Sequence, residues 1–254
     1  MGDPQNIDDS PASKAQPTSA EAAARALREL ILEGSIPAGS RLGQDELAER
    51  LGVSRTPLRT ALAELSREGL VEYSSHRGYW VRGFNSTDIT SVFEVRANLE
   101  ALACQLAARN GLPAERIAWL EQRLEDGDRI LSAGKLLPEK LAPYRRMNVD
   151  FHSAIIEASA NPWVADFVNR CHNVPMASDR IFLWGEQDFP VIHRSHDDHH
   201  RILNAIASRD GDRAAALMRE HVRFAGEVLV KSLEDAARQP GVRSIGLISH
   251  GQLP

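Results

Sequence analysis

The sequence has only two cysteines, Cys104 and Cys171, and no CxxC pair of the kind found in metal sites. A disulfide framework is therefore excluded, and this cysteine usage fits a reducing compartment. No stretch approaches the roughly 18 to 20 consecutive apolar residues that a membrane span needs, and the N-terminus has no apolar signal core. We therefore expect a cytoplasmic protein without a membrane partner.

The sequence also lacks a strong excess of either charge. The net charge of −5 argues against a protein that coats nucleic acid without selecting a sequence. Residues 1–20 have a balance of −2, and residues 21–84 carry nine arginines against nine acidic residues. A neutral N-terminal module beside a slightly acidic remainder favours site-specific DNA binding.

Composition and periodicity divide the chain into four segments. Residues 1–17 are rich in Pro, Ser, Asp and Gln and predict a disordered tail. Residues 18–84 predict three helices and a two-stranded hairpin, and residues 85–238 predict six helices with short joints. Residues 239–254 predict a loose C-terminal tail. The predicted fold is mostly α: an N-terminal winged helix-turn-helix and a C-terminal all-helical bundle.

Helix caps and breakers place the individual elements. A capping box, Thr18 to Glu21, opens the first helix, and Ser86 or Thr87 is expected to cap the first bundle helix. That bundle helix is expected to bury Val92, Val95, Leu99, Leu102 and Leu106. The later helices are expected at about 44–51, 55–68, 86–110, 113–132, 139–160, 162–184, 190–208 and 212–237, and the strands at 70–73 and 79–82.

Residues 47–59 have the features of a helix-turn-helix. Gly52 suits the tight turn, and Pro57 suits the first turn of the following helix. Three leucines fall on one face of that helix and are expected to pack inward: Leu58, Leu62 and Leu65.

The opposite face of that helix presents arginines near its N-terminus, the end that a recognition helix places in the major groove. An arginine there can bind guanine with two hydrogen bonds, or a phosphate. The alternative is that these arginines are ordinary solvated charges. The residues expected to contact DNA lie at this helix start and in the hairpin loop: Ser54, Arg55, Thr56, Arg59, His76, Arg77 and Gly78.

Residues 27–42, the helix-turn-helix and the run from Glu68 to Tyr79 resemble the winged helix of the GntR regulators. The resemblance implies that Arg55 and Arg59 contact the operator, that Ser54 or Thr56 contacts phosphate, and that residues 76–78 form the wing. Some members carry an arginine near the start of the second helix. This chain has Gln44 and Asp45 there, so its operator preference is expected to differ.

Histidines suggest a second site. Asn148 and His152 are four residues apart and share a helix face, and His199 and His221 lie on two later predicted helices. If these helices surround one cavity, the asparagine oxygen and three imidazoles can bind Zn²⁺, Ni²⁺ or Mn²⁺. The alternative is that they are separate core or surface histidines.

Residues 88–228 are similar to the FCD ligand-binding domain of the FadR-type branch of GntR regulators. The matching pieces are 95–100, Asn148 to His152, Asn161-Pro162, 199–206 and 219–221. In many members an aspartate at the position of Asn148 joins the three histidines on a divalent metal. Asn148 keeps a ligating oxygen but lacks the negative charge of aspartate, which is expected to weaken metal binding. His196 is a reserve candidate for a metal ligand.

Arg96 is the candidate effector-binding residue. The resemblance places it on the first bundle helix facing the same cavity, where a guanidinium can hold a carboxylate; Arg145 is a second candidate. The alternative for Arg96 is a surface ion pair with Glu100, four residues later.

The sequence therefore predicts a homodimeric, ligand-controlled repressor of double-stranded operator DNA that senses a small organic acid. Binding of the acid to the metal and Arg96 is expected to release the DNA. Two alternatives are a metal-free sensor of a long acyl thioester and a metalloenzyme with a three-histidine centre.

Overall fold

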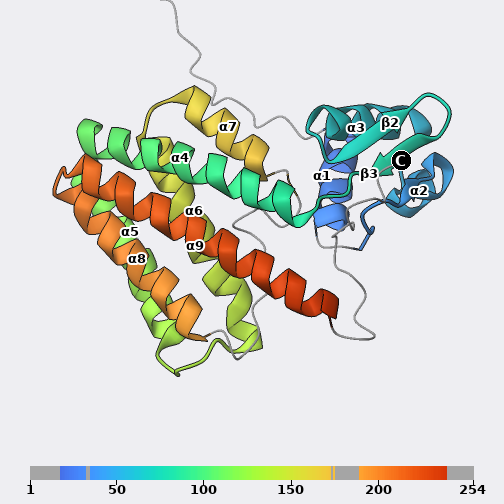
Figure 1. The fold of residues 1–254 in the computed structure, drawn as a ribbon. Helices are drawn as coiled ribbons and strands as arrows, with labels where there is room; N and C mark the ends of the chain where they lie inside the picture. Colours follow the sequence, from blue (N-terminus) through green and yellow to red (C-terminus); the bar gives the residue numbers. More distant parts are fainter. Residues whose placement is uncertain (1–17, 33–34, 173, 175–188, 239–254) are drawn as a thin grey trace, which may run out of the picture.

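The computed structural model describes residues 18–32, 35–172, 174 and 189–238. Within these residues the chain forms nine α-helices and three short strands, so the fold is mostly α, as predicted. In chain order the elements are α1 (Ser19–Leu32), β1 (Arg41–Leu42), α2 (Gln44–Leu51), α3 (Arg55–Arg67), β2 (Val71–Ser74), β3 (Gly78–Val81), α4 (Ser86–Asn110), α5 (Ala114–Leu131), α6 (Pro138–Ala158), α7 (Pro162–His172), α8 (Phe189–Ala207) and α9 (Gly211–Arg238). Figure 1 shows α1–α3 and the small sheet beside the bundle formed by α4–α9.

The N-terminal module forms as local sequence signals predict. The backbone N–H of Thr18 donates to Glu21, and the Glu21 N–H donates to the Thr18 hydroxyl, which completes the capping box. Helix α2 ends at Gly52, whose φ of 65° is the left-handed conformation that glycine tolerates. The three leucines predicted to pack inward are fully buried: Leu58, Leu62 and Leu65.

The wing is a three-stranded antiparallel sheet in the order β1-β3-β2. Strands β2 and β3 form the predicted hairpin, with Ser74 opposite Gly78 across a three-residue loop. Gly78 has a φ of 85°, which suits the residue after such a loop. Strand β1, which pairs Arg41 with Trp80, was not predicted because two residues are too short to show alternation.

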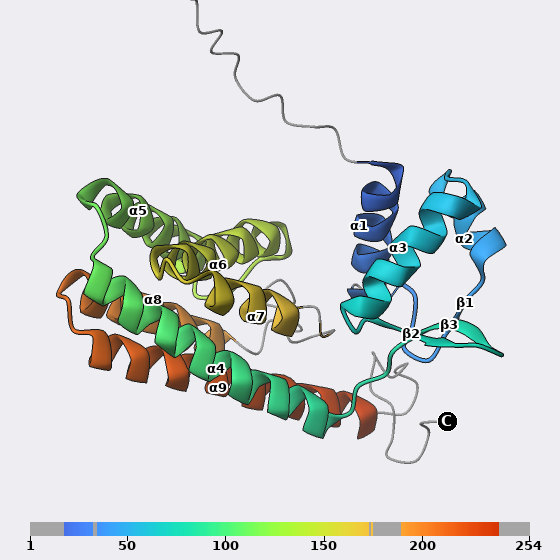
Figure 2. The same ribbon diagram turned by 90° about the horizontal axis from the view of Figure 1, so that it is seen from above.

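Helix α4 is the centre of the bundle. It lies antiparallel against α9, as both views show (Figures 1 and 2), and it also contacts α6, α7 and α8. Gly226 permits the close approach, because a Cβ there would fall 2.6 Å from the Phe93 ring.

The predicted buried face of α4 is wrong at two positions. Val95 and Leu102 are 53% and 40% exposed, and the buried stripe consists mainly of small side chains. These are Ala97, Ala101, Ala103, Cys104, Ala107 and Ala108. Small residues bring the helix backbones close together, and they carry little hydrophobic signal in the sequence.

The structure places the start of one helix differently from the sequence prediction and confirms the start of another. Asn85, rather than Ser86 or Thr87, caps α4, and it forms a capping box with Asp88. Asn161 caps α7 as predicted, by accepting from the backbone N–H groups of residues 163 and 164. The predicted tails and the predicted extension of that helix to residue 184 lie outside the described residues.

In the described part of the chain, no helix is long and apolar enough to cross a membrane.

Candidate functional site

The predicted DNA-reading residues lie together at the start of α3. Ser54 is the N-cap residue, and its side chain makes no capping hydrogen bond, so its hydroxyl is available to a phosphate. Arg55, Thr56 and Arg59 are exposed, while the opposite face of the helix packs into the core. The helix start thus presents two guanidinium groups and its free backbone N–H groups on one surface.

Arg55 already has an acidic partner on the neighbouring helix. Its Nε lies 2.7 Å from a carboxylate oxygen of Asp45 in the first turn of α2, and both side chains are more than 70% exposed. Asp45 and Gln44 stand near the start of α2, where the resemblance to the GntR regulators implies an arginine in some members. If Arg55 contacts the operator as predicted, the carboxylate of Asp45 competes with DNA for its guanidinium.

We expect Asp45→Asn to tighten operator binding by about twofold to fivefold at low salt, because an exposed ion pair contributes at most about 1 kcal/mol. Fluorescence anisotropy with a labelled duplex measures the change. Glu49→Gln removes the same charge from the same helix but leaves the Arg55 pair intact. Equal effects of both variants would mean that only net charge matters.

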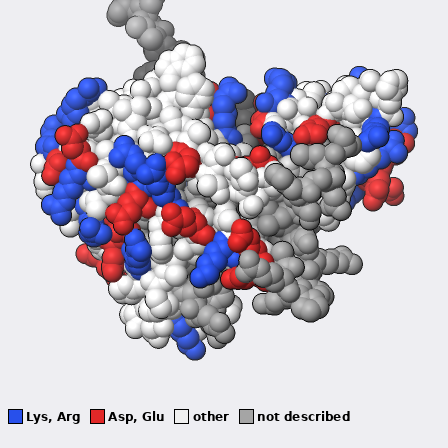
Figure 3. Space-filling model, viewed as in Figure 1, with Lys and Arg blue, Asp and Glu red and all other residues white. Residues whose placement is uncertain are grey.

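The wing loop presents its residues to solvent. His76 and Arg77 are exposed, and the positive φ of Gly78 turns the chain back into β3. On the face drawn in Figure 3, basic and acidic side chains alternate over the helical bundle, so the bundle presents no broad basic surface on that face.

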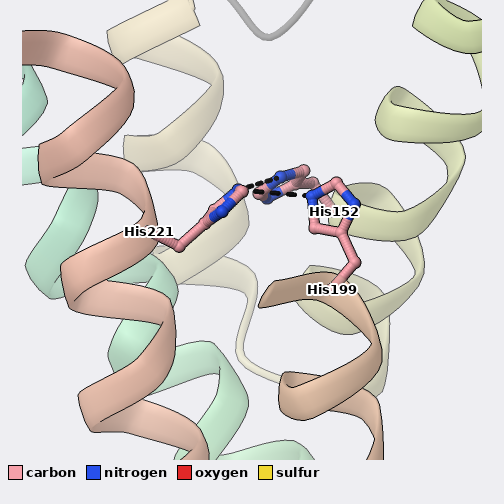
Figure 4. A group of neighbouring side chains, drawn as sticks. All are labelled: His152, His199 and His221. Carbon is pink, nitrogen blue, oxygen red and sulfur yellow. Dashed lines mark hydrogen bonds between the residues drawn. The ribbon is translucent and has the colours of Figure 1, made fainter. Parts of the chain in front are cut away.

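The structure brings three predicted histidines together inside the bundle. His152 on α6, His199 on α8 and His221 on α9 point toward one another from three helices (Figure 4). The Nε2 atom of His221 lies 3.2 Å from Nε2 of His199 and 3.3 Å from Nε2 of His152. All three side chains are buried.

Burial determines the protonation of two of these rings. Loss of water lowers the pKa of His221 to about 3, helped by the neighbouring His152 and partly opposed by Glu100. Burial, followed by the charges of His221 and His152, holds the pKa of His199 well below its usual value. Both imidazoles are therefore neutral near pH 7, and each retains a lone pair that can bind a metal.

A buried carboxylate orients the third ring. The His152 Nδ1–H donates to a carboxylate oxygen of Glu100 at 2.6 Å, and in the neutral tautomer with this proton the lone pair is on Nε2, which faces His221. The Arg96 Nε donates to the other Glu100 oxygen, also at 2.6 Å. Burial alone would raise the pKa of Glu100, but Arg96 and His152 hold it well below its usual value.

This donor set fits a divalent metal. A tetrahedral ion with bonds of about 2.05 Å holds its ligand atoms about 3.3 Å apart, which matches the two nitrogen separations. Without an ion, Nε2 of His221 has one proton at most to offer two neighbouring nitrogens. A cation at their centre would use all three lone pairs.

The other residues predicted for this site lie on α4, α6 and α8. Asn148 is buried on α6, one helical turn before His152. Arg96 forms the ion pair with Glu100 that was the alternative to effector binding, but the pair is buried rather than at the surface. His196 faces Asp128 instead of the three histidines. Arg145 is half-buried on α6.

Glu100 is the functional residue that the sequence prediction missed. Its sequence signals were its spacing from Arg96 and its place in the matching piece 95–100, and neither indicates that it orients His152.

We expect Glu100→Gln to lower the free energy of unfolding by about 3 kcal/mol, because it removes the buried negative charge that pairs with Arg96 and accepts from His152. Urea unfolding of the full chain measures the loss. Glu94→Gln is the matched control on the same helix, since Glu94 pairs with Arg223 at the surface. That control is expected to cost less than about 1 kcal/mol, and similar costs for both variants would contradict this role of Glu100.

Two family models match the chain. Residues 19–81 match the model of the bacterial regulatory proteins of the gntR family, and residues 91–224 match the FCD domain.

The chain is similar to curated proteins over most of its length. The Nta operon transcriptional regulator of Aminobacter aminovorans is 31% identical over 189 residues, which are 73% of this chain and 82% of that protein. The HTH-type transcriptional repressor GlaR of Escherichia coli is 29% identical over 206 residues, or 78% of this chain and 90% of that protein.

Solved structures show the same fold. E. coli McbR/YncC superposes with a TM-score of 0.67 at 22% identity, covering 85% of this chain and 99% of that chain. A GntR-type protein from Rhodococcus gives a TM-score of 0.61 at 21% identity, with the same coverage.

Proposed function

Because the chain belongs to the GntR family of bacterial regulatory proteins and carries an FCD domain, we propose that it is a repressor controlled by a small organic acid. Members of this family are DNA-binding transcription regulators, so the chain is a regulator and not an enzyme. The metalloenzyme hypothesis is therefore wrong. The finer assignment to the FadR-type branch is part of the proposal.

The observation that carries the proposal is the convergence of the three Nε2 atoms of His152, His199 and His221. These residues would hold a divalent metal, with the Asn148 amide oxygen as the fourth ligand from the same face of α6 as His152. A bound metal would act as a Lewis acid that accepts a carboxylate in an open position. A sensor of a long acyl thioester needs no metal centre, so this set of potential ligands favours a small carboxylic acid as the effector.

Arg96 is the proposed second contact of the effector. It is buried on α4, and its positive charge lies close enough to contribute to the lowered pKa of His221. Its guanidinium donates to Glu100. A carboxylate that binds Arg96 would compete with Glu100 and loosen the hydrogen bond that orients His152.

Helix α4 connects the two sites. It carries Arg96 and Glu100, and its capping residue Asn85 follows the end of β3 by only four residues. Figure 2 shows the start of α4 beside the winged helix. A shift of α4 on effector binding would therefore move the DNA-reading module, which needs only a few kcal/mol of differential binding.

We propose that the protein acts as a homodimer, because a two-fold dimer matches a palindromic operator. Val95 and Leu102 are seven residues apart on α4 and exposed, which makes this face a candidate for the dimer interface. Sedimentation of the full chain tests the assembly state.

Release of DNA by short carboxylic acids tests the sensing function. Zinc-loaded protein is bound to a labelled operator duplex, and hydroxy acids, sugar acids, dicarboxylates and aromatic acids are added in turn. We expect at least one class to release the duplex from the wild type but not from Arg96→Ala. If every class leaves the complex unchanged, the proposal that a carboxylate controls this protein fails.

A further inference from the structure

A second histidine cluster lies between α8 and α5, next to the first one, since the centroids of the His196 and His199 rings are 6.0 Å apart. Asp128 of α5 faces His196 and His200 of α8, which are four residues apart and so lie on the same helix face. One carboxylate oxygen of Asp128 lies 2.9 Å from Nε2 of His196 and 3.2 Å from Nε2 of His200. Three potential ligand atoms from two helices thus meet within one small volume.

Helix α5 has a glycine at the position where the His196 ring packs against it. Gly127 lies inside the helix, where glycine is destabilising relative to alanine. A Cβ at this position would fall 2.3 Å from Cε1 and 2.9 Å from Nε2 of His196. The missing side chain therefore lets the His196 ring lie against the helix, with its Nε2 beside Asp128.

We propose that Asp128, His196 and His200 bind a second divalent cation, zinc or a metal of similar preference, between α5 and α8. Two imidazoles and one carboxylate are a ligand set that zinc accepts, with a fourth position left for water. The two separations from Asp128, 2.9 and 3.2 Å, lie within a few tenths of an ångström of the roughly 3.3 Å that a tetrahedral ion sets between its ligands. Burial lowers the pKa of His196, against the opposing effect of its hydrogen bond to Asp128, so the ring is neutral near pH 7. Its Nε2–H donates to Asp128, and a cation that binds there takes the place of that proton.

The two metal sites differ in access to solvent. The first is closed by three buried histidines, whereas the Asp128 and His200 side chains are 53% and 38% exposed. A cation in the second site therefore exchanges with the medium more readily. A cation in the second site would also link α5 to α8, the helix that carries His199. It would therefore restrict the motion of a helix that supplies a ligand to the first site.

Metal stoichiometry tests the inference. The full chain is stripped with chelator and titrated with Co²⁺, with bound metal followed by visible absorption and counted by equilibrium dialysis. We expect two ions per chain in the wild type and one in His200→Ala. His193→Ala is the matched control, because His193 lies on α8 but pairs with Asp197 at the surface, and it should keep both ions.

The result for His152→Ala separates this site from the first one. We expect that variant to keep one ion, and the double variant with His200→Ala to keep none. If His200→Ala binds as much metal as the wild type, or if His152→Ala alone binds none, the second site does not exist. Loss of an ion in His200→Ala but not in His152→Ala would uphold the second site and overturn the first.

Discussion

Replacing Arg55 or Arg59 by alanine is expected to weaken operator binding by about 10- to 100-fold, the usual effect of losing an arginine that contacts a base. Both side chains are exposed at the start of α3, and the buried leucines on the other face fix the orientation of the helix. The substitutions should therefore leave the fold unchanged. Anisotropy titrations with a labelled duplex measure the loss.

Arg67→Ala is the control for these variants, because Arg67 is exposed at the far end of the same helix. It removes the same charge, so only the general attraction to phosphate should fall. If Arg67→Ala weakens binding as much as Arg55→Ala, the start of α3 does not read the operator.

Replacing His152 by alanine is expected to abolish tight metal binding and the response to the effector. The variant loses one of the three converging Nε2 atoms and the ring that Glu100 orients. Protein that passes through gel filtration in metal-free buffer should carry about one equivalent of zinc, nickel or manganese, and the variant almost none. At a metal concentration of about 100 times Kd, the wild type also gains about 2.7 kcal/mol of stability.

The same measurement on His193→Ala provides the comparison, since that exposed side chain lies outside both histidine clusters. It should retain the metal and the metal-dependent rise in Tm. A His152→Ala protein that keeps its metal, or a wild type that takes up none, would mean that the buried histidines serve only packing.

The DNA-binding module could be predicted closely because its signals are local. The capping box at Thr18, the turn at Gly52 and the leucine face of α3 each lie within one or two helical turns. Such features determine the backbone with little help from distant residues. Strand β1 was missed because its formation depends on pairing with β3, which lies about forty residues further along the chain.

The buried site was predictable only in part. The resemblance to the FCD domain selected the three histidines, but it gave no role to Glu100. The contact between Glu100 and His152 depends on how α4 is rotated, and the alanines that set this rotation are weak signals. The contact of Asp128 with His196 could not be predicted either, because the two residues are 68 positions apart in the sequence.

Selection of duplexes from a random pool of double-stranded DNA tests most directly whether this protein is a sequence-specific regulator. The account predicts enrichment of an inverted repeat, with the two halves related as the recognition helices of a two-fold dimer. It also predicts that the selected duplex binds the wild type far more tightly than Arg55→Ala. A pool without any enriched sequence, or equal binding by both proteins, would contradict it.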